Sequence, residues 1–284
     1  MSPRKNGTSS ARSSPRPLDS PWPRPSPALL SSTTNIVVSM LYHGLPADFK
    51  HTSDMDVSKI KGNVNSEVPV HSCRIRVGRS IEGFGLSPGI TQEQRVGVES
   101  LMKNAFKKLP EGLNGNYYPL IGMDEKVRQQ LVDDHFLFVS GDRNLTVAGM
   151  ERDWPEGRGI FHNESKTFLV WVNEEDQLRI ISMQKGGDVK GVFERLAKGI
   201  KAVQDSVKAE SGKDFMLDPQ LGYLHSCPTN LGTRGESGGQ TGHTYDISNK
   251  HRLGYSEIQL VQTMIDGVNT LYKEDLEFQK KHGM

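Results

Sequence analysis

Arginines recur at short spacing in the segment that begins at Ser72. Arg74 and Arg76 lie two positions apart, and Arg79 follows three positions later. Residues two apart on a strand point to the same face, so Arg74 and Arg76 could present two guanidinium groups to one anion. The alternative is an ordinary solvated strand face. The spacing alone favours that alternative, because surface arginines are common.

Three consecutive acids, Glu174, Glu175 and Asp176, precede Arg179 between two apolar runs. One of these carboxylates could point into a cleft as a base or an orienting group, with the arginine at the start of the next strand. A hydrophilic turn would have the same composition. The acids are therefore a weak signal when taken alone.

Cys227 ends another apolar segment and is followed by Pro228 and a glycine-rich stretch, 232–242. This position predicts an exposed, reactive thiol. The glycine-rich stretch suits either a mobile lid or a backbone that cradles phosphate, and the alternative is a flexible surface loop. Because the Walker A and protein-kinase motifs are absent from the sequence, any nucleotide site must be of another kind.

His135 lies between a pair of aspartates and the apolar run that begins at Phe136. A single histidine beside an apolar run is more typical of packing than of ligand binding. No second histidine or cysteine stands at metal-ligand spacing, so we expect no metal site formed by the protein itself.

Two continuous apolar runs, 167–172 and 178–183, are separated by the polar residues 173–177, a connection of hairpin length. Continuous rather than alternating runs predict strands that are buried on both faces and covered by helices. Further strands are expected at 72–77, from its alternating pattern, and at 221–226.

Helices are expected around this sheet. Capping boxes at Thr91 and Ser256 begin two of them. A third is expected near 124–132, and a long amphipathic helix is expected over 189–207. Residues 113–118, rich in Gly, Asn and Tyr, predict a loop. Sheet segments at the centre with helices before, between and after them indicate an α+β domain.

Composition excludes several other classes. The formal net charge of +1 argues against a general nucleic-acid binder, and no apolar run is long enough to span a bilayer. Two cysteines are too few for a disulfide scaffold, which favours a reducing, cytoplasmic setting. Residues 1–40, rich in Pro, Ser and Arg, predict a flexible tail more than a mitochondrial transit peptide. Residues 41–68 predict an extended lead-in.

Taken together and in order, these segments resemble the phosphagen (guanidino) kinase family. Ser-Cys-Arg-Ile-Arg-Val-Gly-Arg-Ser at 72–80 is similar to one family segment, and Lys-Thr-Phe-Leu-Val-Trp-Val-Asn-Glu-Glu-Asp at 166–176 is nearly the family signature. The other matching segments are 133–138, 153–155, 157–160, 162–163, 181–184, 221–223, 227–233 and 245–249. The resemblance covers about residues 50–275 and implies a central, mostly antiparallel sheet flanked by helices.

The resemblance also implies roles for individual residues. It places Glu175 and Glu236 at the carboxylates that orient the guanidino group, and Cys227 beside the guanidinium. The nucleotide-binding positions that it implies are Ser72, Arg74, Arg76, His135, Arg179, Arg234 and Asp246. Among them, the three arginines at 74, 76 and 179 grip the phosphates, while His135 lies by the adenine and Asp246 near the ribose.

The implied reaction is a reversible, in-line transfer of the γ-phosphoryl group of MgATP to a guanidino acceptor. The acceptor would be arginine, creatine, lombricine, taurocyamine or glycocyamine, and the sequence leans toward invertebrate-type members. Magnesium would arrive with the nucleotide. No nucleic acid or membrane is expected as a partner, and a homodimer is one option for the assembly.

Two features depart from the family pattern. The small helical domain that family members carry ahead of the catalytic domain is replaced here by the tail. Within the catalytic domain, residues 69–284, the sequence passes from Thr233 directly to Arg234, where the family has further strands, a helix and phosphate-binding arginine positions. A deletion at 233/234 would weaken the phosphate clamp. The alternative hypothesis is therefore an inactive remnant that binds a nucleotide or a partner.

Overall fold

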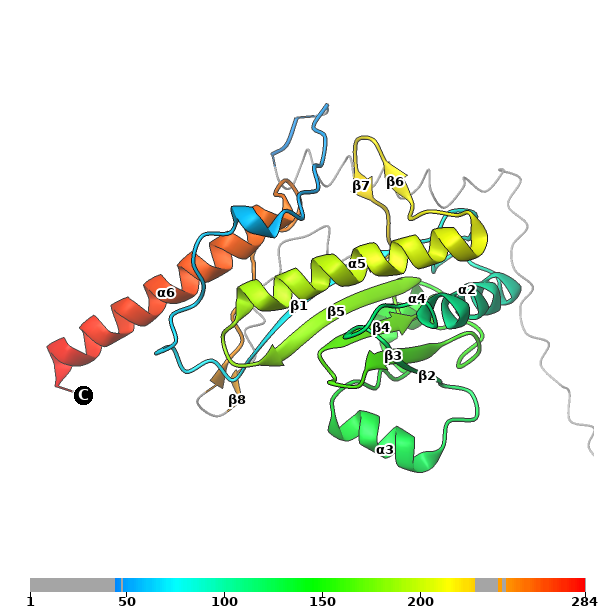
Figure 1. Ribbon diagram of the computed structural model, residues 1–284, viewed down its shortest axis with the longest axis horizontal. Coiled ribbons are helices and arrows are strands. Elements are labelled where there is room, and N and C mark those ends of the chain that lie inside the picture. The colour runs from blue at the N-terminus through cyan, green and yellow to red at the C-terminus, as the bar shows by residue number, and fades with distance from the viewer. Residues whose placement is uncertain (1–43, 47, 228–239, 242–243, 284) are drawn as a thin grey trace, which may run out of the picture.

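A five-stranded antiparallel sheet forms the centre of the protein in the computed structural model, which describes residues 44–46, 48–227, 240–241 and 244–283. Its strand order is β1-β5-β4-β3-β2. The strands are β1 (Ser72–Arg79), β2 (Gly115–Pro119), β3 (Gly159–Asn163), β4 (Phe168–Val172) and β5 (Leu178–Lys185). Helices flank this sheet (Figure 1), so the expected α+β fold is confirmed.

The helices begin where the sequence signals placed them. Both predicted capping boxes form, with Thr91 accepting a hydrogen bond from the Gln94 amide and Ser256 from the Gln259 amide. The helical elements are η1 (Val57–Lys59), α2 (Gln92–Phe106), α3 (Glu125–Asp133), α4 (Arg143–Val147), α5 (Val189–Ser211) and α6 (Glu257–His282). Two small ribbons pair β6 (Leu217–Asp218) with β7 (Gly222–Tyr223), and β8 (Gln240–Thr241) with β9 (Thr244–Tyr245).

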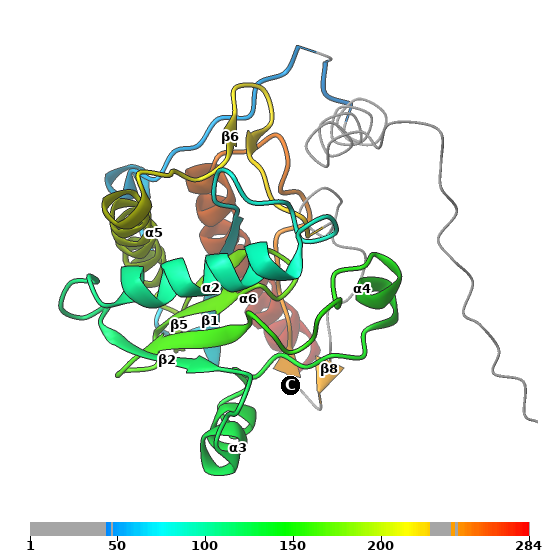
Figure 2. The same cartoon turned by 90° about the vertical axis from the view of Figure 1, so that its right-hand side faces the viewer.

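Both faces of the sheet are covered, as the continuous apolar runs predicted. On β4, Phe168 and Val170 pack into the larger core beneath α2 and α5, whereas Leu169 and Trp171 pack into a second cluster with α3 residues. Figure 2 shows α2 across one side of the sheet and α3 on the other. This alternation follows from the period of two along a strand.

Two local predictions were wrong. Residues 115–119 form β2 instead of a loop, because they pair in register with β3 and Tyr117 stacks on Phe106 at a ring distance of 5.8 Å. Tertiary packing thus overrides the turn-like composition. In the predicted strand 221–226, only Gly222 and Tyr223 are in a strand, and they pair with the two residues of β6.

The lead-in runs along α6. The amide of Asp54 donates to Glu257, and the amide of Lys61 donates to Gln262. Farther along, Ile60 and Val64 pack with α5 and α6 residues in a third apolar cluster. The segment before β1 is therefore tied to the last helix by hydrogen bonds from its backbone amides to α6 side chains and by apolar burial.

Two helical glycines offer a matched test of this packing. A Cβ at Gly199 in α5 would overlap the ring of Phe168, whereas a Cβ at Gly267 in α6 would meet open space. We expect Gly199→Ala to destabilise the fold by about 1–3 kcal/mol through overpacking. Gly267→Ala should stabilise it by about 0.5–1 kcal/mol through helix propensity. The midpoints of urea unfolding measure both effects, and a Gly199→Ala protein as stable as the parent would contradict the packing described here.

Candidate active site on β1, β5 and the turn before β5

Three arginines share one face of the sheet. In the β1–β5 register Arg179 lies opposite Gly78, so Arg179 is on the same face as Arg74 and Arg76. Burial, together with the positive charges of Arg179 and Arg74, lowers the pKa of Arg76 to about 10. Such a cluster of like charges is relieved when an anion binds to it.

Gly78 leaves space on this sheet face for the side chains of Asp176 and His225. A Cβ there would lie 2.6 Å from Asp176 Oδ2 and 2.9 Å from the ring of His225. Any larger residue would therefore displace the groups that surround Arg179.

Arg179 binds the acidic turn that precedes its own strand. Its Nη2 lies 2.9 Å from Glu175 Oε2, 3.4 Å from Glu174 Oε2 and 3.5 Å from Asp176 Oδ2. Burial would lower the pKa of Arg179, but Glu174, Asp176 and other negative groups raise it above its ordinary value. The guanidinium is therefore fixed in charge and in position beside Glu175, the carboxylate expected to orient the acceptor.

Asp176 has a role that sequence reasoning did not assign to it. Its side chain has no exposed surface, and Oδ1 accepts hydrogen bonds of 2.7 Å from the amides of Ser226 and Cys227. Burial would raise its pKa, but His225, Arg179 and the Cys227 amide lower it below the ordinary value. Asp176 thus joins the acidic turn to the segment that carries Cys227.

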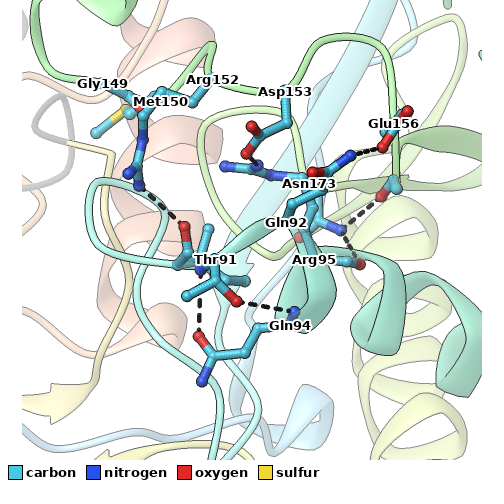
Figure 3. Close-up of polar contacts among 12 residues, drawn as sticks. Thr91, Gln92, Gln94, Arg95, Gly149, Met150, Arg152, Asp153, Glu156 and Asn173 are labelled. Atoms are coloured by element: carbon cyan, nitrogen blue, oxygen red, sulfur yellow. Dashed lines mark hydrogen bonds and ion pairs between the residues drawn. The ribbon is translucent and has the colours of Figure 1, made fainter.

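The acidic turn is closed by Asn173, whose amide donates to Gln177 O at 2.8 Å. Asn173 has a φ of 56°, a conformation that Asn tolerates better than most residues. Its side-chain amide donates to Arg95 O at 3.0 Å and to Gly157 O at 2.6 Å. Figure 3 shows Asn173 between α2 and the 149–158 loop.

The 149–158 loop is itself held by arginines. Arg95, which is 1% exposed, forms an ion pair of 2.8 Å with Asp153. Arg152 donates to Pro88 O and Ile90 O at 3.0 and 2.9 Å. The 149–158 loop, to which the Asn173 side chain donates, is therefore held by an ion pair and by hydrogen bonds to backbone carbonyl groups.

A cavity of about 1130 Å³ borders the arginines of β1. Of the expected nucleotide-binding residues, Ser72, Arg74, Arg76 and Asp246 line this cavity. Arg252, which the sequence reasoning did not select, lines it as well and lowers the pKa of Arg76. The sequence did not indicate that Arg252 would line the cavity, because its position depends on the path of the chain after β9.

The other expected site residues lie elsewhere. His135 has an exposed side chain and directly follows α3, which packs on the same side of the sheet as the three arginines. Cys227 is only 2% exposed, so the expectation of an exposed thiol is wrong, because the Asp176 contact draws this segment inward. Glu236 and Arg234 lie outside the described residues.

The described residues offer neither a membrane-spanning helix nor a cluster of metal-ligating side chains. No helix there has the length and apolar character needed to cross a membrane. Within the same residues, no three His, Cys, Asp or Glu side chains are grouped closely enough to hold a metal ion.

The comparison with known proteins identifies the family. A family model described as the C-terminal catalytic domain of ATP:guanido phosphotransferases matches residues 97–235 and 232–277. A glycocyamine kinase of Hediste diversicolor is 42% identical over 84% of this chain and 69% of the relative. An arginine kinase of Stichopus japonicus is 41% identical over 86% of this chain and 75% of the relative.

A solved structure agrees with these relatives. The crystal structure of a lombricine kinase superposes with a TM-score of 0.79 at 39% identity, covering 87% of this chain and 77% of the other. The chain belongs to the ATP:guanido phosphotransferase family. Enzymes of this family transfer a phosphoryl group from ATP to a guanidino compound, a reaction that suits arginines beside a fixed carboxylate.

Proposed function

We propose that this chain binds MgATP against the arginines of β1 and β5 and holds a guanidino acceptor at the acidic turn. One observation carries the proposal. Arg74, Arg76 and Arg179 share a sheet face, and Arg179 Nη2 lies 2.9 Å from Glu175 Oε2. A phosphate-binding group and a carboxylate that can bind a guanidinium therefore lie side by side.

The chemistry follows from these positions. The transferring phosphoryl group spreads negative charge over three oxygens, which the arginines can stabilise. Glu175 would hold the cationic acceptor in line with the γ-phosphorus, and no covalent intermediate is required. Family resemblance adds proposed roles for Ser72, His135 and Asp246 in nucleotide binding and for Cys227 beside the guanidinium. Magnesium would accompany the nucleotide, coordinated by its phosphates.

We also propose that a segment is missing between Thr233 and Arg234. The two stretches matched by the family model overlap at residues 232–235, which is the junction itself. If two phosphate-binding arginine positions are absent there, turnover should be far slower than for intact family members, because each such group contributes orders of magnitude in rate. Glu236 would then be the second acceptor carboxylate and Arg234 a remaining phosphate-binding group.

A turnover assay tests this function. ATP consumption is followed in a coupled assay with arginine, creatine, glycocyamine, taurocyamine and lombricine as separate acceptors. We expect slow turnover with one of these acceptors. We expect a large increase when the segment that family members carry is inserted between Thr233 and Arg234. A chain that binds MgADP but shows no turnover with any acceptor, with or without the insertion, would be a nucleotide-binding remnant.

The proposal also includes a cytoplasmic setting. Cys73 and Cys227 form no disulfide, which suits a reducing cytoplasm better than an oxidising compartment. The assembly state is a separate question that sedimentation analysis would decide, with a homodimer as one option.

A further inference from the structure

Arg79 is a buried cation that has no acidic partner in the part of the chain that the structure describes. It is 5% exposed, and no carboxylate of the described residues lies within 4.0 Å of its guanidinium. Its Nη1 donates to Gly78 O at 2.7 Å, but its Nε has no hydrogen-bond partner among the described residues. Burial lowers the pKa of Arg79 to about 10, which reflects this poor compensation.

Arg79 does not belong to the phosphate face. It follows Gly78, so the alternation of β1 directs it to the opposite face from Arg74 and Arg76. Its partner in the register, Leu178, belongs to the core beneath α2 and α5. A phosphate bound by Arg74 and Arg76 on their face would therefore not pair with Arg79.

The two acids that raise the pKa of Arg79 already accept hydrogen bonds from other groups. Glu257 accepts from Ser53 Oγ at 2.8 Å and from the amide of Asp54 at 2.7 Å. Asp176 accepts from two backbone amides and faces Arg179. Both acids influence the pKa of Arg79 from a distance, but neither forms an ion pair with it.

The surroundings of Arg79 suit an anion that approaches in the plane of the guanidinium. The ring of Tyr223 covers one flat side, with its centroid 3.9 Å from the guanidinium carbon. Arg79, Tyr223 and His51 all line the large cavity. His51 Nδ1 is also buried without a hydrogen-bond partner among the described residues. The Nε edge of Arg79 and His51 Nδ1 are therefore two unsatisfied nitrogen atoms at one cavity.

Arg95 and Arg158, two other buried arginines, lack this combination. Arg95 is paired with Asp153, and Arg158 donates to several backbone carbonyl groups of the 149–158 loop. Neither of them lines the cavity.

We infer that Arg79, with His51 and Tyr223, forms a second anion site that binds a small oxyanion such as a carboxylate or sulfate. The planar fork of arginine matches two oxygens of such an anion, and the buried setting strengthens the pairing. Arg79 stands on the other face of β1 from Arg74 and Arg76, so the site has anion-binding groups of its own, although both sets of residues line the same cavity.

Thermal unfolding of the full chain tests the site. Sodium sulfate and sodium acetate are compared with sodium chloride of equal ionic strength, with and without saturating MgADP. At an anion concentration ten times its Kd, we expect the apparent unfolding constant to fall about 11-fold. The response should persist in MgADP and in Arg74→Ala, because neither change touches the Arg79 site.

Variants separate this site from general salt effects, which act on every variant alike. Arg79→Met should lose the response, and Arg79→Lys should weaken anion binding at least tenfold, because lysine lacks the planar fork. If Arg79→Met does not fold, Arg79→Lys and His51→Asn decide the question. Arg128→Lys, an exposed change on α3, is the control and should respond like the parent. An absent response, one that survives both Arg79→Lys and His51→Asn, or one that MgADP or Arg74→Ala abolishes would overturn the inference.

Discussion

Replacing Arg179 with alanine should weaken MgADP binding at least tenfold and remove measurable phosphoryl transfer. Arg179, one of the three proposed phosphate-binding arginines, also contacts the acidic turn, with Nη2 2.9 Å from Glu175 Oε2. Its loss removes charge stabilisation from the transferring phosphoryl group and the partner that fixes Glu175. Calorimetric titration with MgADP and the coupled assay measure the two effects.

The same change should also destabilise the fold. Without Arg179, three carboxylates in one buried turn lose their shared cation, and breaking a buried pair in this way costs about 3–5 kcal/mol. Arg179→Lys keeps the charge but loses the fork, so it should fold better than the alanine variant and still bind MgADP weakly. A folded Arg179→Ala protein with parental MgADP affinity would rule out the phosphate-binding role.

Asp176→Asn should produce the largest change in pH-dependent stability. Asp176 is fully buried, and its pKa is lowered in the folded protein by His225, Arg179 and the Cys227 amide against the opposing effect of burial. A carboxylate with a depressed pKa contributes stability that is present above its unfolded pKa, about 4 for Asp. That stability is lost as the pH falls through the lower, folded value.

Urea unfolding between pH 3 and pH 8 measures this contribution. The parent should lose stability steeply below about pH 4, whereas Asp176→Asn should be less stable at neutral pH and lose less on acidification. The neutral-pH loss should be about 3–5 kcal/mol, because Arg179 is left partly unpaired and the amide cannot accept equally well from two backbone groups. Asp133→Asn, at an exposed position on α3, is the matched control. Identical pH profiles for the parent and Asp176→Asn would show that Asp176 does not anchor the Cys227 segment.

The sequence predicted elements whose signals are local. Capping boxes at Thr91 and Ser256 and the hairpin between β4 and β5 need only neighbouring residues, so their positions could be read directly. The loop prediction at 115–119 was wrong because this Gly-, Asn- and Tyr-containing stretch forms a strand only when it pairs with β3. Local composition therefore carries less information where pairing comes from a distant segment.

In the candidate site, too, local features could be predicted from the sequence and long-range contacts could not. Alternation along β1 predicted that Arg74 and Arg76 share a face, but nothing in the sequence showed that Asp176 would accept from residues fifty positions later. The exposed-thiol expectation for Cys227 was wrong for the same reason. Residue roles that come from family resemblance, such as those of His135 and Asp246, remain predictions because no ligand contact defines them.

The hydrogen bonds between the lead-in and α6 also determine when the domain can become complete. The amide of Asp54 and its acceptor Glu257 are separated by 203 positions, and other contacts between the same two elements span similar distances. During synthesis, these early residues must wait until nearly the whole domain has been translated before their partners exist. Contacts between residues that are so far apart in the sequence form late and slowly during folding. Residues 48–68 should therefore be the part of the nascent domain most exposed to proteases and chaperones before α6 is made.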